Sequence, residues 1–334
     1  MTTSSDDLLV DLAADRVGGS VLAANDEFFA EKENLIADAD PVWDPDRFTD
    51  HGKWMDGWET RRRREAGYDW VILRLGIPGI IRRIVVDTAF FTGNYPESCA
   101  LEASDLIGDP DPTGIDSARW AEVVPRTPLQ GDTRVDVPLP RPAAATHVRF
   151  VIHPDGGVAR LRVMGDPIPP AGLLDGSPVD LAALATGARA VDCSNHHYSS
   201  PNRMLVSGPA RGMWDGWETR RRRGPGNDWT VVRLAGRGVV ERLEVDTTHF
   251  KGNAPASGAV FAVDAPGIEV PDPGHPGWRP LLARTPLSPD TVHGFDDLAA
   301  AEPVTHLRLD IHPDGGVARF RAWGRSTKPW TSAP

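Results

Sequence analysis

The chain has 334 residues and a formal net charge of −11, which results from 36 lysines and arginines against 47 aspartates and glutamates. At roughly 150 residues per domain this length predicts two domains, and the acidic balance argues against a general nucleic-acid binder, which needs a basic face to displace counterions. Two cysteines exclude a disulfide scaffold, and the apolar runs fall short of the roughly 18–20 residues that a membrane span requires.

Residues 1–19 are predicted to form an N-terminal tail with a short helix. Leu8, Leu9 and Leu12 lie at helical spacing, which favours one apolar helix face. Gly18-Gly19 follows as a helix stop. The residues before Leu8 are acidic where a secretion signal would be basic, so we expect a cytoplasmic protein whose thiols are reduced.

The dominant feature of the sequence is an internal repeat. Residues Asp56–Arg64 recur as Asp215–Arg223, and His153–Arg160 recur unchanged as His312–Arg319, both at an offset of 159 positions. A period of this length is too long for a solenoid unit and indicates a duplicated domain. The prediction divides the chain into the N-terminal tail (1–19), repeat one (20–165), a linker rich in Gly and Pro (166–178), repeat two (179–325) and a C-terminal tail (326–334).

Each repeat shows a β pattern. Trp70–Leu75 and Ile80–Thr88 are rich in β-branched residues, and Gly-Ile-Pro-Gly separates them into two predicted strands. His147–Ile152 and Val158–Val163 flank Pro-Asp-Gly-Gly, whose glycines suit a turn. Strands and helices do not alternate, so the sequence predicts an all-β fold class with two tandem β-sandwich or jelly-roll domains.

Candidate chemistry is concentrated in the repeated motifs, because the sequence carries no phosphate-binding glycine loop, serine-nucleophile elbow or HExxH metal motif. Each Asp-Gly-Trp-Glu-Thr-Arg motif combines carboxyl groups, arginines and a tryptophan. Arginine forks bind carboxylates, and a carboxyl group can accept N–H bonds from ureido groups or act as an acid when buried. This combination suits a small nitrogen-rich anion. The residues are Asp56, Glu59, Arg61 and Arg62 in the first copy and Asp215, Glu218, Arg220 and Arg221 in the second.

Further candidates lie at the ends of predicted strands, where sites are often placed. The two copies differ there, because Phe90 corresponds to His249 and Thr92 to Lys251. The differences predict either one working site beside a scaffold or one composite site built from both copies. The strand-end candidates are Asp87, Asn94 and His153 in the first copy and Asp246, His249, Lys251, Asn253 and His312 in the second.

A structural interpretation stands beside the functional one. A buried network of arginine and carboxylate groups can simply hold two sheets together. Trp58 and Trp70 are good core residues, and for them we favour the core over ligand contact. Four successive arginines cannot all face one side of a strand, so some of them are expected to be solvated or paired outward.

The motifs resemble those of the allantoicase family. The resemblance rests on Asp-Gly-Trp-Glu-Thr-Arg-Arg and His-Pro-Asp-Gly-Gly-Val-Ala-Arg in both halves, and on Val-Asp-Thr-Ala-Phe-Phe-Thr-Gly-Asn with its counterpart Val-Asp-Thr-Thr-His-Phe-Lys-Gly-Asn. Leu22–Ala30, followed by Glu33-Asn34-Leu35, extends it toward the N-terminus. The motifs occur in the right order, twice, from about residue 8 to residue 325.

The resemblance implies two similar jelly-roll domains of the galactose-binding-like kind in a homo-oligomer. It implies hydrolysis of allantoate to ureidoglycolate and urea in purine breakdown, with allantoate as the small-molecule partner and neither nucleic acid nor membrane involved. No cofactor is required by the sequence. A divalent metal is possible, since some family members are associated with one, but the sequence offers no evident ligand set.

The chemistry suggests roles for these residues. Allantoate carries a carboxylate and two ureido groups on one carbon, so loss of urea needs a proton donor, a base for water and a cation for the carboxylate. No tetrahedral oxyanion forms on this route, so no serine triad is needed. We hypothesise that Arg61 and Arg62, or Arg220 and Arg221, hold the carboxylate. The acid and base are expected among Asp56, Glu59, Asp87 and His153, or among Asp215, Glu218, Asp246, His249 and His312.

Two other functions remain open at this point. Jelly-roll domains often bind sugars or other small ligands without catalysis, and a fold does not determine a function. That function predicts an export signal and an attached catalytic domain, neither of which the sequence shows. A purely structural subunit gives no reason for charged motifs that are nearly unchanged in both copies.

Overall fold

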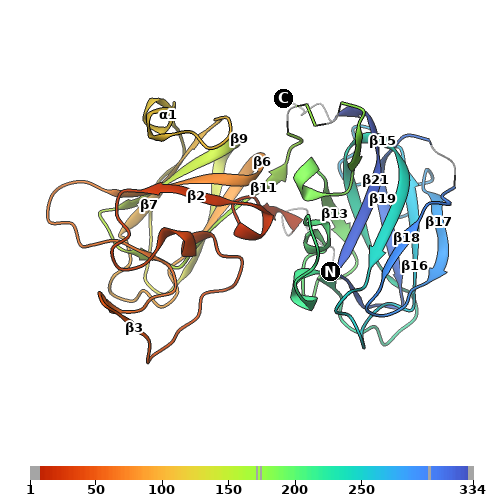
Figure 1. Ribbon diagram of the computed structural model, residues 1–334, viewed down its shortest axis with the longest axis horizontal. Coiled ribbons are helices and arrows are strands. Elements are labelled where there is room, and N and C mark those ends of the chain that lie inside the picture. Colours follow the sequence, from red (N-terminus) through yellow and green to blue (C-terminus); the bar gives the residue numbers. More distant parts are fainter. Residues whose placement is uncertain (1–7, 171, 174, 300–301, 330–334) are drawn as a thin grey trace. The chain divides into compact units, whose positions relative to one another are not determined.

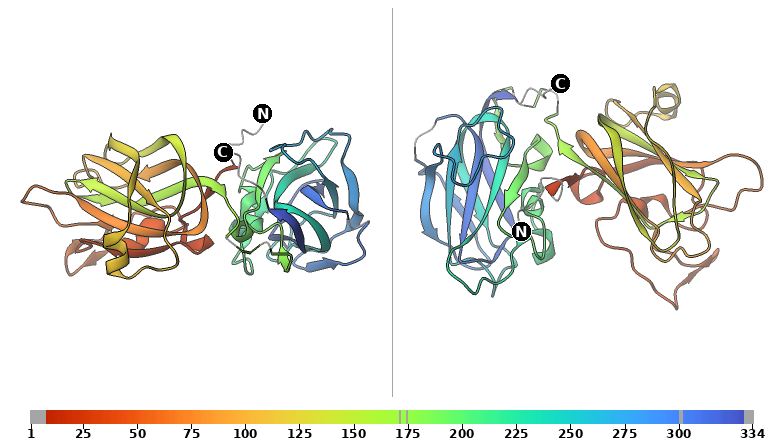
Figure 2. Two further views of the ribbon diagram at one scale, coloured as in Figure 1. Left: turned by 90° about the horizontal axis from the view of Figure 1, so that it is seen from above. Right: turned by 180° about the vertical axis from the view of Figure 1, so that it is seen from behind.

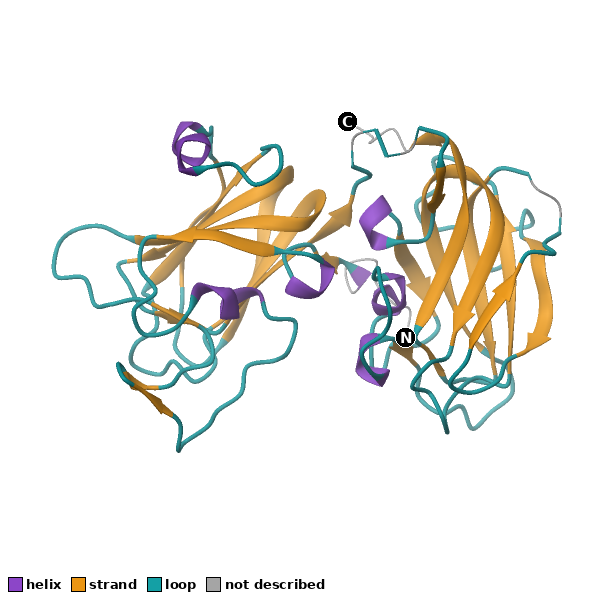
Figure 3. Cartoon of the chain, in the orientation of Figure 1, coloured by secondary structure: helices purple, strands orange, loops and turns teal. Residues whose placement is uncertain are grey.

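The computed structural model describes residues 8–170, 172–173, 175–299 and 302–329. The chain divides into two compact units. We call Val10–Asp166 the N-terminal domain. The C-terminal domain comprises the chain from Pro167 onward together with the segment before Val10, of which the structure describes Leu8 and Leu9. Strands dominate each domain and the helices are short (Figures 2 and 3). Within the described ranges every helix is too short or too polar to cross a lipid bilayer.

The N-terminal domain is built on two long strands, which lie beside shorter ones in Figure 1. Its strands are β1 (Val10–Asp11), β2 (Ser20–Ala24), β3 (Phe48–Thr49), β4 (Gly52–Lys53), β5 (Trp58–Glu59), β6 (Asp69–Asp87), β7 (Ser98–Ser104), β8 (Ala121–Pro128), β9 (Arg134–His153), β10 (Gly157–Val158) and β11 (Arg160–Pro167). Its helices are the 3-10 helices η2 (Asp15–Val17) and η3 (Lys32–Ile36) and the α-helix α1 (Pro112–Ser117).

The C-terminal domain has a similar set of strands, with one long strand where the N-terminal domain has two. Its strands are β12 (Pro178–Asp180), β13 (Arg189–Cys193), β14 (Trp217–Glu218), β15 (Asp228–Asp246), β16 (Ser257–Val263), β17 (Arg279–Pro286), β18 (Val292–Phe295), β19 (Val304–His312), β20 (Gly316–Val317) and β21 (Arg319–Pro329). Its helices are the 3-10 helices η4 (Leu184–Thr186), η5 (Pro201–Leu205) and η6 (Met213–Asp215).

The long strands explain how one sheet forms both layers of a jelly-roll sandwich. The first part of β6 pairs with β2 and with the end of β9, whereas its last residues pair with the start of β9. The register shifts between Arg74 and Gly79, where the strand bends. In the C-terminal domain β15 likewise pairs first with β13 and β19 and then with β18, while β21 follows its second half. Inward side chains alternate along these strands and form the core.

The observed strands confirm the predicted all-β fold class and refine the predicted strand limits. The two strands expected at Trp70–Leu75 and Ile80–Thr88 are one bent strand, β6, because Gly76–Gly79 continues the ladder through a bulge instead of ending it. Trp58 is fully buried, as expected for a core residue, whereas Trp70 is half-buried.

The N-terminal tail differs from the predicted short helix. Residues 1–7 lie outside the described residues, and the rest of the segment forms strand β1 and the 3-10 helix η2. Val10 pairs with Gly165, and the backbone N–H of Leu12 donates to the carbonyl of Val163 at 2.8 Å. Main-chain bonds to the edge of the sheet therefore outweigh the helical spacing of three leucines. The expected stop is present, because Gly18 ends η2 with a φ of 94°.

A buried histidine makes the stability of the C-terminal domain dependent on pH. His306 lies in β19, its Nδ1 is 2.9 Å from the hydroxyl of Thr305, and its Nε2 is 3.3 Å from the carbonyl oxygen of Glu269. Burial lowers the pKa of His306 from 6.5 to about 4. The unfolded imidazole therefore binds a proton at a higher pH than the folded one, and unfolding is favoured as the pH falls.

We expect the free energy of unfolding to fall by about 3 kcal/mol between pH 6.5 and pH 4 through this residue, with the full stability present above pH 6.5. Urea denaturation of the wild type and of His306→Gln across this range measures the difference. The variant should lose that part of the pH dependence. The exposed His196 provides the control, because His196→Gln should keep it; equal pH dependence in wild type and His306→Gln would contradict the assignment.

Candidate functional site

A glutamate–asparagine pair occupies the same place in both domains. Glu59 and Glu218 lie in the two-residue strands β5 and β14, which pair with β10 and β20. Asn94 donates its side-chain N–H to Oε1 of Glu59 at 2.6 Å, and Asn253 donates to Oε1 of Glu218 at the same distance. The structure thus brings together candidates that the sequence gave no reason to pair.

The asparagines are held by their own backbone as well as by the glutamates. The carbonyl of Asn94 accepts from the N–H of Gly157 at 2.7 Å, and that of Asn253 accepts from Gly316 at 2.9 Å. The Asp-Gly-Gly turns therefore position the amide that meets each carboxylate. Burial raises the pKa of Glu59, and the bond from Asn94 opposes this. Glu59 is 8% exposed, whereas Glu218 is half-buried and more accessible to a ligand.

One arginine in each run has a structural role. Arg63 places Nη1 at 2.7 Å from Oδ1 of the buried Asp69, and its backbone N–H donates to Asp155 at 2.8 Å. Arg222 makes the matching contacts with the buried Asp228 and with Asp314. The third arginine of each run therefore fixes the loop, while the others remain exposed. This agrees with the expectation that four successive arginines divide between different directions.

The loop that carries the arginines is also tied to the core tryptophans. In the N-terminal domain the indole N–H of Trp58 donates to the carbonyl of Asp26 at 2.8 Å. The Asp26 carboxylate accepts from the backbone N–H of Arg61 at 3.0 Å and pairs with its side-chain Nε at 2.6 Å. Although partial burial opposes it, the N–H groups of Phe28 and Arg61 and the Arg61 guanidinium hold the pKa of Asp26 below its ordinary value. Asp26 is thus a charged partner of Arg61.

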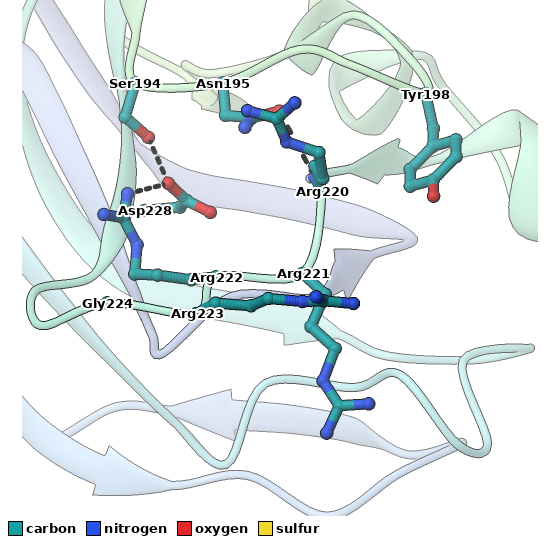
Figure 4. A pocket seen from close by; sticks show the side chains of 9 residues that line it. All are labelled: Ser194, Asn195, Tyr198, Arg220, Arg221, Arg222, Arg223, Gly224 and Asp228. Atoms are coloured by element: carbon teal, nitrogen blue, oxygen red, sulfur yellow. Dashed lines mark hydrogen bonds and ion pairs between the residues drawn. The ribbon is translucent and has the colours of Figure 1, made fainter.

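In the C-terminal domain the same loop borders a cavity of about 690 Å³ (Figure 4). Figure 4 shows Arg222 directed at Asp228 and Arg220 beside Asn195, with Tyr198 on the far side. The cavity is open to solvent, and its lining is rich in guanidinium groups. The lining residues are Ser194, Asn195, Tyr198, Arg220, Arg221, Arg222, Arg223, Gly224 and Asp228. A small anion fits this volume and charge.

Asp56 and Asp215 occupy structural positions instead of the site. The Asp56 carboxylate accepts from Nη2 of Arg160 at 3.0 Å, and Asp215 accepts from Nη2 of Arg319 at 2.8 Å. Asp215 and Arg319 are 0% and 2% exposed. Both aspartates form ion pairs that hold their loops in place. This is the structural role for buried arginine and carboxylate groups that the sequence analysis set beside the functional one.

The strand-end candidates divide in the same way. Asp87 and Asp246 each accept from the backbone N–H two residues ahead, at 2.8 and 2.7 Å, and so cap turns. His249 has a φ of 73° and its Nε2 lies 3.0 Å from the carbonyl oxygen of Ala210. The exposed Lys251 has Asp290 at 3.8 Å. These contacts give each group a local structural function.

The two histidines before the turns remain half-buried. The His153 ring packs edge-on against Tyr68, with 5.4 Å between the ring centroids. Burial, with a contribution from Arg126, lowers the pKa of His153; burial, with a contribution from Arg284, lowers that of His312. Both imidazoles are therefore biased toward their neutral forms, in which one ring nitrogen can accept a proton.

Sequence reasoning missed Asp26, Asn195 and Tyr198. Asn25 and Ser194 make equivalent bonds to the backbone N–H groups of Trp70 and Trp229, which places this segment at an offset of 169 positions. The motifs that recur most clearly, from Asp56 and from His153, have an offset of 159. A search at one offset does not align the segment; a search that allows an insertion in the first copy would find it.

A second cavity of about 620 Å³ lies elsewhere in the C-terminal domain. Its charged lining includes Arg319 and Arg321, which bond to backbone carbonyls and to Asp215 and Asp180. The candidate site is therefore the first cavity. Among the described residues, no group of three or more His, Cys, Asp or Glu side chains is placed to hold a metal ion.

Comparisons with known proteins agree with this architecture. A family model described as Allantoicase repeat matches residues 10–168 and 179–327. The chain is 49% identical to a probable allantoicase of Nocardia farcinica over 95% of this chain and 94% of that protein. It is 44% identical to a probable allantoicase of Pseudomonas aeruginosa over 96% and 97%. A crystal structure of allantoicase from Saccharomyces cerevisiae is 34% identical, with a TM-score of 0.79 over 94% of this chain and 92% of that chain.

Proposed function

Because the chain belongs to the allantoicase family, we propose that it is an allantoicase, a hydrolase that converts allantoate and water to ureidoglycolate and urea. The observation that carries the proposal is the arginine-lined cavity of the C-terminal domain. Glu218, which is bonded to Asn253, precedes the first of these arginines by two residues in the chain. Arginine forks match the carboxylate of allantoate. Amide and carboxylate groups match the donors and acceptors of its two ureido groups.

In this proposal Arg220 and Arg221 bind the substrate carboxylate and Glu218 transfers the protons. The Glu218 carboxyl protonates the ureido nitrogen that leaves, and the C–N bond breaks to release urea. The lone pair of the remaining ureido nitrogen forms the C=N bond of an iminium-like intermediate. Water then adds to that carbon and gives its proton back to Glu218, which yields ureidoglycolate. Asn253 orients Glu218 through the bond to Oε1.

The proposed function is tested by incubating the purified full-length protein with allantoate. We expect urea and ureidoglycolate to appear in equal amounts, because each turnover breaks one C–N bond and consumes one water. Urea is measured with a coupled urease assay and ureidoglycolate by chromatography. A folded protein that releases no urea, with or without an added divalent metal, would overturn the proposal and leave a non-catalytic binding domain as the alternative.

We further propose that the protein acts in the cytoplasm as a homo-oligomer. The buried free thiol of Cys99 supports a reducing compartment. The family resemblance supports an assembly of identical subunits, and light scattering of the purified protein measures the number of subunits.

A further inference from the structure

The two domains differ at one position that decides the charge of the arginine loop. Asp26 and Asn195 are equivalent, because each accepts an indole N–H, from Trp58 and Trp217, at its backbone carbonyl. Each also accepts, at side-chain Oδ1, the backbone N–H of the first arginine in the run. The backbone geometry is thus conserved between the copies while a carboxylate is replaced by a neutral amide.

This replacement removes the ion-pair partner of the first arginine in the run. In the N-terminal domain the guanidinium of Arg61 is paired with Asp26 at 2.6 Å. In the described part of the C-terminal domain, no carboxylate lies within ion-pair distance of Arg220. Arg220 lines the cavity together with Arg221 and Arg223, so three of its four arginines have no charge partner among the described residues. The cavity therefore carries positive charge that an incoming anion can neutralise.

The surroundings of the two arginine loops also differ, because the N-terminal domain has additional groups packed near Arg61. Phe28 lies over the Arg61 guanidinium at 5.3 Å and packs on His51, with 4.1 Å between the ring centroids. His51 belongs to the β3–β4 hairpin, which lies in a connection that the C-terminal domain lacks: Val42 and Asp56 are 14 positions apart, whereas Arg211 and Asp215 are four apart. In the N-terminal domain Arg61 therefore contacts a carboxylate and the ring of Phe28, and the inserted hairpin packs on that ring through His51.

We propose that the C-terminal cavity alone binds the carboxylate of the ureido-acid substrate, and that the Asp26/Asn195 difference determines this choice. Asn195 supplies the same backbone support as Asp26 without neutralising Arg220. The N-terminal domain supplies its anion internally through Asp26 and keeps the loop fold without the site. The inference rests on the proposed function for the identity of the substrate, and it assigns one anion site to each chain.

The test uses N-carbamoylglycine, which has one carboxylate and one ureido group and lacks the second ureido group that would leave. Isothermal titration of the full-length protein should give one site per chain. Asn195→Asp should weaken binding about 10- to 100-fold, the loss expected when one charge-assisted hydrogen bond is removed. The matched variant Asp26→Asn should change the affinity less than threefold. The neutral N-carbamoylglycinamide should bind wild type and Asn195→Asp alike.

A second pair of variants guards against an effect on folding. Arg220→Gln removes the exposed cation directly and should weaken N-carbamoylglycine binding as much as Asn195→Asp does, whereas Arg61→Gln should not. Two sites per chain, no measurable binding to the wild type, or equal losses from Arg61→Gln and Arg220→Gln would overturn the inference. Failure of this inference can be told apart from failure of the proposed function. The binding pattern can hold in a protein that releases no urea, and urea release can persist when Asn195→Asp has no effect.

Discussion

Replacing Glu218 by glutamine is expected to lower kcat for urea release about 100- to 10,000-fold, the usual contribution of a group that transfers protons in the reaction. Glutamine has nearly the same shape and can still accept the side-chain N–H of Asn253, so the local structure should persist. It can neither protonate the leaving nitrogen nor take a proton from water. The measurement is steady-state kinetics with allantoate, in which KM should change little because the arginines that hold the carboxylate are untouched.

The corresponding change in the N-terminal domain is the control. Glu59 has the equivalent partner Asn94, but Glu59 is buried, and Arg61, two residues further on, is paired with Asp26. Glu59→Gln should therefore keep kcat within threefold of the wild type. If Glu59→Gln abolished turnover and Glu218→Gln did not, the catalytic site would lie in the N-terminal domain. Full activity of both variants would remove the glutamates from the mechanism.

Replacing Arg319 by methionine should destabilise the C-terminal domain by about 3–5 kcal/mol, the usual cost of leaving one charge of a buried ion pair without its partner. The Arg319 guanidinium bonds to the Asp215 carboxylate at 2.8 Å and to the carbonyls of Gly208 and Pro209 at 2.9 and 3.0 Å. Methionine fills much of the volume but satisfies none of these acceptors. The melting temperature of the domain should fall by about 6–20 °C, as measured by calorimetry.

An exposed ion pair of similar geometry provides the comparison. Arg237 bonds to both carboxylate oxygens of Asp264, and both side chains are about one-third exposed. Arg237→Met should cost at most about 1 kcal/mol, because water screens the pair. The double variant Arg319→Met with Asp215→Asn should lose less stability than the sum of the single losses, since no unpaired charge remains. Additive losses would show that the pair does not act as one unit.

The fold was predictable from the sequence to the extent that local patterns agree with it. The repeated motifs and the β-branched runs on both sides of Gly-Ile-Pro-Gly predicted two all-β domains. The pattern predicted two strands where β6 is one bent strand, because a bulge and a turn look alike in sequence. The short helix expected from the spacing of Leu8, Leu9 and Leu12 is present only as η2, farther along the tail, and it ends at Gly18 as expected. The leucine segment contains strand β1 instead, because β1 pairs with the distant β11, a partner that no local pattern records.

The candidate site was predictable in its residue types more than in its geometry. The sequence identified Glu59, Glu218 and the arginine runs because they recur. It did not separate Asp215 from Glu218, since burial against Arg319 is a property of the tertiary structure. It also passed over Asn195, because the copies are out of register there and because an asparagine in place of an aspartate is informative only once both are seen to hold the same backbone.

The longer connection of the N-terminal domain also identifies a position for grafting foreign peptides. Its two ends are fastened to one another, since Arg160 bonds to Ala39 at 2.9 Å and to Asp56 at 3.0 Å, and the Asp56 carboxylate accepts from the backbone N–H of Val42 at 2.8 Å. Doubling the length of a loop between fixed ends costs only about 0.6 kcal/mol. A reporter epitope or an affinity tag placed between Val42 and Asp56 would therefore be displayed on the surface while the C-terminal domain keeps its native sequence.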